Sequence, residues 1–225
     1  HVLIDGGNRV TLDGGGTRRI LYQNTCDKRQ IWTTPHCQDQ ATPRLEIRNL
    51  AMVRGNSTGD LADNGGGGAV FARGGTLTLR NVRFAGNRCD RVGPDVAGAA
   101  VRAFSQHRNR PILVVDSTFT GGRCSNGGAI GGIGVSWRIV RSTFTGNKAT
   151  GHGANPQRPG TPGGGNGGAI YMDGNLIRLH LIRTTMTGNV APEGGGAIFF
   201  VSNNRTGTAT LAASTLRGNP SHGFE

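Results

Sequence analysis

The 225-residue chain contains 40 glycines and 9 prolines, and its 25 lysines and arginines outnumber 13 acidic residues to give a net charge of +12. No Gly-X-Y period is present, which excludes collagen, and no apolar run approaches the roughly 18 residues of a membrane span. The positive charge favours anionic partners, but without a basic run or an aromatic RNA-binding motif nucleic acid is disfavoured.

Short strand-like runs recur along the chain after a divergent first segment. That segment contains TCDKRQIWTTPHC, and we predict it as an insertion over residues 22–44. The runs mix apolar and polar residues in imperfect alternation and are rich in Val, Ile, Thr and Leu, as half-buried strands are. They read LEIRNLAM, LTLRNVRF, ILVVDSTF, WRIVRSTF, LHLIRTTM and TLAASTL.

Two motifs alternate with these runs. The first reads GGAVFARG, GAAVRAFS, GGAIGGIG, GGAIYMDG and GGAIFFVS, beginning at Gly67, Gly98, Gly127, Gly167 and Gly195. The second, typified by FAGN and FTGN, ends in a turn residue at Asn56, Asn87, Gly122, Asn147, Asn189 and Asn219. We predict that this Asn column is structural, with each amide bonding to neighbouring repeats.

This self-similarity predicts stacked repeat units, because one copy of each motif occurs per repeat. No stretch shows helical periodicity, so we predict an all-β fold: one domain over residues 1–225, wound as a single-stranded parallel β-helix of about seven coils. The residue after each GGA motif should form an interior stack. These residues are Val70, Val101, Ile130, Ile170 and Ile198.

The alternation of GGA[VI] with FxxN resembles the repeats of chlamydial polymorphic outer-membrane proteins. It is also similar to bacterial secreted β-helix proteins of the pectate-lyase-like superfamily (pectin lyase-like), and the opening HVLIDGGNRVTLDGGG looks like their first coil. The resemblance covers nearly the whole chain. It implies a right-handed coil, export from the cell and contact with surface polysaccharides or host cells.

The four cysteines allow three pairings, and without a CxxC motif they predict no zinc site. FAGNRC and FTGGRC place Cys89 and Cys124 at the same motif position in adjacent coils, so we predict that they form a disulfide. Cys26 and Cys37 then pair locally within the insertion. Two disulfides predict an extracellular or cell-surface protein. We predict neither a metal nor a cofactor.

The strand after each GGA motif suggests a binding face. If its first and third residues point inward, the second and fourth point outward, which exposes aromatic and arginine side chains of the kind that bind acidic sugars. The predicted ligand-binding residues are Phe71, Arg73, Arg102, Tyr171 and Phe199, with His107 on the adjoining loop. The alternative is that loops cover this face and make its aromatic residues ordinary packing.

Catalysis has little support in the sequence. The Gly/Pro-rich loop 148–165 contains GHG at Gly151–Gly153, which resembles a motif of the polygalacturonases, but the paired aspartates of those enzymes are missing. Inverting hydrolysis requires two carboxylates, whereas a lyase needs only an Arg, Lys or His base near a neutralising cation. Whether the protein is an enzyme is left open.

Our leading prediction is a bacterial extracellular domain that binds an anionic polysaccharide, cell-surface glycan or envelope polymer without catalysis. The first alternative is a polysaccharide lyase or glycoside hydrolase of the pectate-lyase-like group. The second is a structural passenger or adhesin domain of a larger surface protein. The sequence predicts no oligomeric state.

Overall fold

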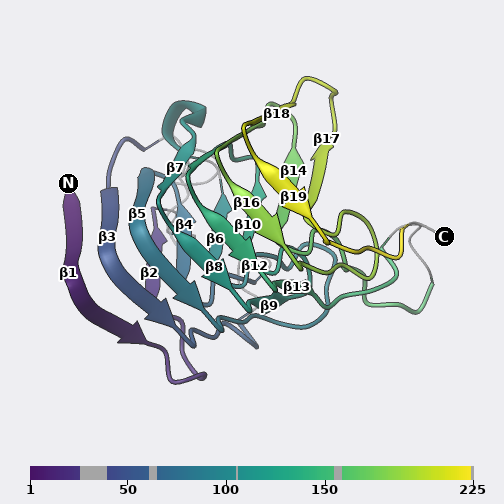
Figure 1. The fold of residues 1–225 in the computed structure, drawn as a ribbon, viewed down its shortest axis with the longest axis horizontal. Helices are drawn as coiled ribbons and strands as arrows, with labels where there is room; N and C mark the ends of the chain where they lie inside the picture. Colours follow the sequence, from purple (N-terminus) through teal and green to yellow (C-terminus); the bar gives the residue numbers. More distant parts are fainter. Residues whose placement is uncertain (26–39, 61–64, 105, 155–158, 224–225) are drawn as a thin grey trace, which may run out of the picture.

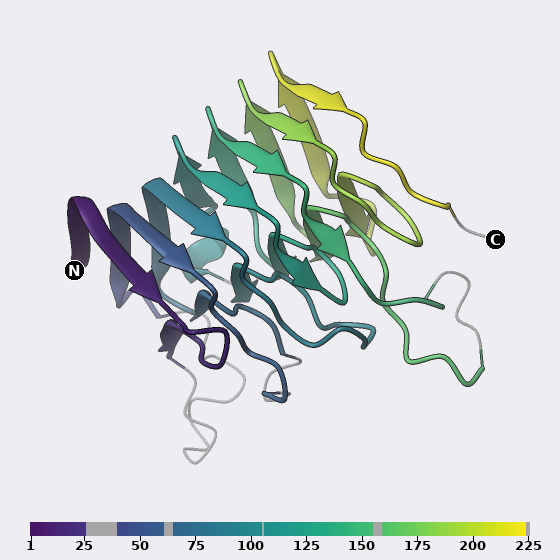
Figure 2. The same cartoon turned by 60° about the horizontal axis from the view of Figure 1, so that its bottom comes forward.

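The computed structural model describes residues 1–25, 40–60, 65–104, 106–154 and 159–223, and in them parallel strands stack along one axis (Figure 1; Figure 2). The largest sheet has eleven strands, of which β1, β3 and β5 are long and the later ones are split in two. Its strands are β1 (Val2–Asp13), β3 (Arg44–Val53), β5 (Thr76–Ala85), β7 (Ile112–Val115), β8 (Thr118–Thr120), β11 (Trp137–Val140), β12 (Thr143–Thr145), β15 (Arg178–Ile182), β16 (Thr185–Thr187), β18 (Thr208–Ala212) and β19 (Thr215–Arg217).

Two further sheets complete the wall of the stack. The six-stranded sheet contains β2 (Leu21–Asn24), β4 (Val70–Arg73), β6 (Val101–Phe104), β10 (Ile130–Ile133), β14 (Ile170–Gly174) and β17 (Ile198–Ser202). The two-stranded sheet pairs β9 (Arg123–Cys124) with β13 (Lys148–Ala149). The helical element in the described residues is the single 3-10 turn η3 (His107–Asn109). The predicted all-β parallel β-helix is therefore confirmed, while the number of coils stays a prediction.

The interior stack after the GGA motif is confirmed. Ile130 and Ile170 are in register on neighbouring strands and have no exposed surface. The third residue of each strand also faces the core, and at Gly132 the missing side chain makes room for Trp137, whose Nε1 would lie 2.8 Å from a Cβ there. The core cluster contains Val70, Ala72, Val101, Ala103, Ile130, Ile170 and Met172, with Ile198 and Phe200 packed against it.

An aromatic stack runs beside this column. The rings of Phe84 and Phe119 lie 4.7 Å apart, and those of Phe119 and Phe144 lie 4.6 Å apart, with nearly parallel planes. Their strands are paired in register, and Met52 continues the same column below Phe84. Because equal positions of neighbouring coils lie at the strand spacing, aromatic residues at those positions stack on one another.

The predicted Asn column is present as a ladder of side-chain hydrogen bonds, which we call the asparagine ladder, with one correction. Gly55, not Asn56, is in register with Asn87, because Met52 pairs with Phe84 and Asn56 pairs with Arg88. The sequence letters VRGN match the motif, but the apolar side chain sets the strand register. Asn56 instead donates from its amide to the Gly16 carbonyl at 2.9 Å.

Asn147→Ala is expected to lower the free energy of unfolding by about 1–3 kcal/mol, the usual consequence of leaving buried hydrogen-bond partners unsatisfied. The buried Asn147 amide donates to the Phe119 carbonyl at 3.0 Å and to Asn189 Oδ1 at 2.9 Å, and its oxygen accepts from the Gly122 N–H at 3.0 Å. Urea denaturation measures the change. Asn219→Ala, at the half-exposed end of the ladder, should have a smaller effect, and an equal effect would contradict the importance of burial.

Part of the segment predicted as an insertion is integral to the fold. Residues 22–24 lie in β2, where Tyr22 pairs in register with Phe71 of β4. The centre of that segment, residues 26–39, lies outside the described residues. In the predicted loop 148–165, Lys148 and Ala149 form β13, and His152 forms a β-bridge with Gly163.

Candidate functional site: a cationic groove

The face predicted to bind a glycan is covered. Phe71 and Arg102 have no exposed surface and Tyr171 is 5% exposed, so their predicted exposure is wrong, although they do point away from the core cluster. The alternative interpretation, that these side chains are packed under loops, describes them correctly. Strand parity gives the direction of a side chain but does not reveal what lies above it.

The covering contacts come from neighbouring turns. A Cβ at Gly131, in the same column as Arg102 and Tyr171, would lie only 2.7 Å from the Gly98 N, so the turn at 95–98 presses on this face. Arg102 Nη2 donates to the Asp95 carbonyl at 2.6 Å. The Arg19 guanidinium lies 5.3 Å from the Phe71 ring centroid and donates to the carbonyls of Gly66 and Gly67.

Burial shapes the electrostatics of this covered face. Desolvation lowers the pKa of Arg102 to about 10, with partial compensation from Tyr171 and Asp95. It raises the pKa of the Tyr171 hydroxyl, and Asp173 adds to that shift. The Phe104 ring receives the Arg73 guanidinium at 4.5 Å and that of Arg102 at 4.6 Å. For Arg102, which has no exposed surface, this cation–π contact stabilises a charge that has left water.

The remaining predicted residues do not join one site. Arg73 and Phe199 are half-buried, and the Phe199 ring stacks on Tyr171 at 5.6 Å. His107 lies on η3 next to β7, at the far end of that coil from β9 (Figure 1), and its backbone N–H donates to the Gly75 carbonyl. A role in binding for Arg73, Phe199 and His107 stays a prediction.

The Cys89–Cys124 disulfide is confirmed. The two Cα atoms lie 4.8 Å apart, as expected for equal positions in adjacent coils. The cysteines pack with Val96 and Ala99 in a small buried cluster. Cys26 and Cys37 lie outside the described residues, so their pairing stays a prediction.

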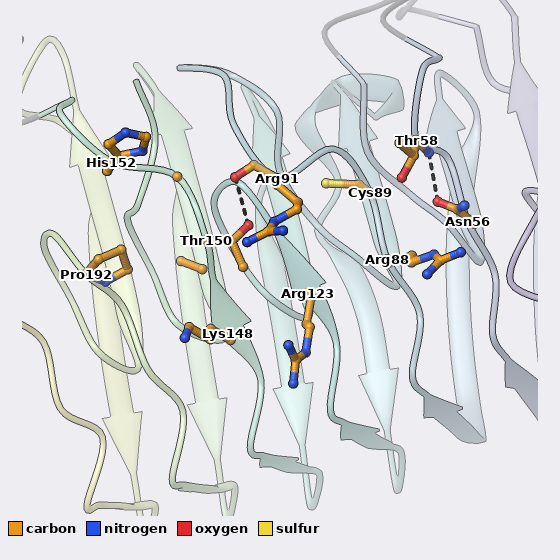
Figure 3. Close-up of a pocket in the computed structure, with 12 residues that line it drawn as sticks. Asn56, Thr58, Arg88, Cys89, Arg91, Arg123, Lys148, Thr150, His152 and Pro192 are labelled. Carbon is orange, nitrogen blue, oxygen red and sulfur yellow. Dashed lines mark hydrogen bonds between the residues drawn. The ribbon is translucent and has the colours of Figure 1, made fainter. Parts of the chain in front are cut away.

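A groove of about 580 Å³ lies beside this disulfide and is the strongest candidate for a functional site (Figure 3). Its floor is a column of residues in parallel register that begins at Asn56 and continues through Arg88, Arg123 and Lys148. Arg91 and His152 stand on the flanking loops. The residues that complete the lining are Thr58, Cys89, Ala149, Thr150, Gly151 and Pro192.

The geometry of the column follows from its sequence position. Arg88, Arg123 and Lys148 each follow the ladder residue directly, and strand alternation turns them outward while the ladder residue is buried. Adjacent coils are separated by about 4.8 Å, the spacing of paired strands. We call this row of three side chains the cation ladder. The loop on one side is fixed where the Thr150 hydroxyl donates to the Arg91 carbonyl at 2.8 Å.

The groove carries uncompensated positive charge. No carboxylate is among its described lining residues, and its three arginines and one lysine are all exposed. Arg88 donates to the Gly16 carbonyl, whereas no ion pair within the described residues involves Arg91, Arg123 or Lys148. Like charges held side by side at the surface attract polyanions and repel cations.

Sequence reasoning missed this groove although the signal was available. FAGNRC, FTGGRC and FTGNKA each place a cation after the ladder position, and the register that predicted the disulfide also aligns those cations. The predicted site instead consisted of aromatic and arginine residues after the GGA motif. His152, the histidine of the GHG motif in the predicted loop 148–165, does reach the groove.

The fold defines a parallel β-helix with a cationic groove along one side. Comparison with protein families adds that residues 141–173 and 183–201, less than half of the chain, are similar to the Chlamydia polymorphic membrane protein repeat. The chlamydial part of the predicted resemblance is thereby confirmed, and the pectate-lyase-like part stays a prediction. No match was found among curated proteins or among solved structures. In the described part of the chain, no helix has the length and apolar character to cross a membrane.

Proposed function

We propose that the protein is a cell-surface or secreted β-helix domain that binds an anionic polysaccharide in its cationic groove. The observation that carries this proposal is the cation ladder of Arg88, Arg123 and Lys148, set in a groove without a described carboxylate. The similarity to a membrane-protein repeat and the disulfide both favour a location outside the cytoplasm.

The ladder suits a polymer better than a small ion. Its cations repeat along the solenoid axis at about 4.8 Å, close to the length of one sugar unit, so a chain lying along the axis can meet one cation per coil. Two of the three residues of the cation ladder are arginines, whose planar guanidinium groups donate two parallel hydrogen bonds to a carboxylate or sulfate.

Arg88→Gln with Arg123→Gln and Lys148→Gln is expected to weaken binding to polygalacturonate and to dextran sulfate about tenfold, since three exposed charge contacts of about 0.5 kcal/mol each are lost. Affinity chromatography and titration calorimetry at low salt measure the change, with neutral dextran as the blank. Binding by the native protein should weaken as salt screens the charges.

The control is a second triple variant that loses the same number of positive charges. Arg138→Gln with Arg178→Gln and Arg217→Gln removes three exposed arginines from other surfaces. If both triple variants lose affinity equally, net charge alone attracts the polymer and the groove is not a site. Arg73→Gln tests the face predicted from sequence, and we expect it to leave binding unchanged.

A lyase is the second candidate, because the groove places His152 beside several arginines and a lysine. This combination offers a base and a cation that could neutralise a uronate carboxylate during elimination. Incubation of the protein with polygalacturonate therefore also tests for lyase activity. An increase in ultraviolet absorbance from unsaturated product, absent in His152→Ala, would make the protein an enzyme, and a flat trace leaves binding as the function.

A further inference from the structure

One cysteine of the buried disulfide borders the cationic groove. Cys89 is among the lining residues and is 3% exposed (Figure 3). Cys124 has no exposed surface and is not part of the lining. The small opening to solvent therefore lies on the Cys89 side of the bond, although the register of the two coils makes their backbone positions equivalent.

We propose that the groove makes the Cys89–Cys124 bond a charge-selective site of thiol–disulfide exchange, which accepts anionic low-molecular-mass thiols at Cys89. A thiolate that carries a further negative group is concentrated by Arg88, Arg91, Arg123 and Lys148, the positive side chains that line the groove. Exchange requires the thiolate form and access to one sulfur, and the groove supplies both attraction and direction. The proposal depends on the charge of the groove and not on polysaccharide binding.

In this reaction the small thiol reduces the Cys89–Cys124 disulfide. The thiolate attacks Cys89 Sγ, the sulfur–sulfur bond breaks, and its electron pair leaves on Cys124 Sγ, which then takes a proton from water. A second thiolate attacks the outer sulfur of the mixed disulfide and releases Cys89 as a thiolate. Two thiols thus become one small disulfide while the protein bond becomes two thiols.

Three reagents of similar size test the charge selectivity: 2-mercaptoethanesulfonate, 2-mercaptoethanol and 2-mercaptoethylamine, whose thiolates are doubly negative, singly negative and net neutral. Rates on the native protein are divided by thiolate concentration and by the rate on a neutral small disulfide, which removes intrinsic nucleophilicity. We expect the doubly negative thiolate to exceed the net-neutral one by about tenfold or more, the lower end of electrostatic rate effects in charged clefts. Added salt should reduce this ratio.

Peptide mapping after an acid quench locates the first adduct. We expect it on Cys89 and not on Cys124, and only the peptides that contain these two residues are scored. Arg91→Gln with Lys148→Gln should reduce the charge ratio, whereas Arg138→Gln with Arg178→Gln, matched in charge, should not. Excess dextran sulfate should protect the bond if the polymer occupies the same groove.

Each contrary result overturns the proposal: a normalised ratio near one, an adduct on Cys124, a ratio unaffected by the groove variant, or no reaction of the native bond with any reagent. Failure of polysaccharide binding would leave these kinetic results in place and remove only the protection by dextran sulfate. Conversely, polysaccharide binding without charge selectivity among the thiols would overturn the exchange proposal and leave the proposed function in place.

Discussion

Ile170→Asp is expected to unfold the coils around β14 and to lower the free energy of unfolding by more than about 4 kcal/mol, a range reached only by severe core changes. Ile170 has no exposed surface and lies in register between Ile130 and Ile198. The substitution removes an apolar contact on both neighbouring strands, and it also buries a carboxylate with no partner.

The effect should depend on pH in a defined direction. Burial raises the pKa of the introduced carboxyl above its unfolded value of about 4, so destabilisation is complete above the raised pKa and decreases as pH falls through it. Urea midpoints across this range provide the measurement. Ile170→Val, which keeps the site apolar, should lower stability by about 0.5–1.5 kcal/mol, and Thr187→Asp on the exposed side of β16 should change it by less than about 0.5 kcal/mol. Similar midpoints for Ile170→Asp and Thr187→Asp would show that the column does not face inward.

The fold could be predicted because each coil repeats the same short sequence motifs at corresponding positions. The GGA motif fixes a corner, the following Val or Ile fixes the inward face, and the FxxN motif fixes the register, as the Cys89–Cys124 disulfide demonstrates. The error at Asn56 has a clear physical cause. Arg54 adopts a φ of 50°, replacing the glycine that has a φ of 60° at Gly86, so the glycine of VRGN falls on the ladder position instead.

The site was harder to predict because it depends on contacts between coils of unequal length. Arg102 and Tyr171 are covered by the glycine that begins the GGA motif of the preceding coil: a Cβ at Gly67 would lie 3.0 Å from Arg102 Cβ, and one at Gly127 would lie 2.9 Å from Tyr171 Cβ. The alternation of inward and outward residues does not reveal that these turns pass over the outward face. The cation ladder, in contrast, needs only the register and the three residues that follow the ladder position. Repetition therefore predicts columns well, and it predicts the covering of those columns poorly.

Gly168→Ala is the second change from which we expect a large loss, because the second glycine of GGA lies against the backbone of the next coil. A Cβ at Gly168 would lie 2.6 Å from the Val190 N and closer still to the Gly196 carbonyl. Backbone cannot rotate away as a side chain can, so the coils must separate and weaken the hydrogen bond from the Gly168 N–H to the Gly195 carbonyl, now 3.0 Å. We expect a loss of about 3 kcal/mol or more, the upper range for overpacking.

Gly188→Ala separates this crowding from the effect of backbone conformation. Gly188 has a φ of 64° and an added Cβ there meets nothing within 4 Å, so the substitution introduces only left-handed strain. That strain amounts to about 1–2 kcal/mol, less than the expected effect at Gly168, where no positive φ contributes. Thermal and urea denaturation of the two variants give the comparison directly. A larger loss at Gly188 than at Gly168 would mean that glycine is needed in these coils for its positive φ and not for the close approach of one coil to the next.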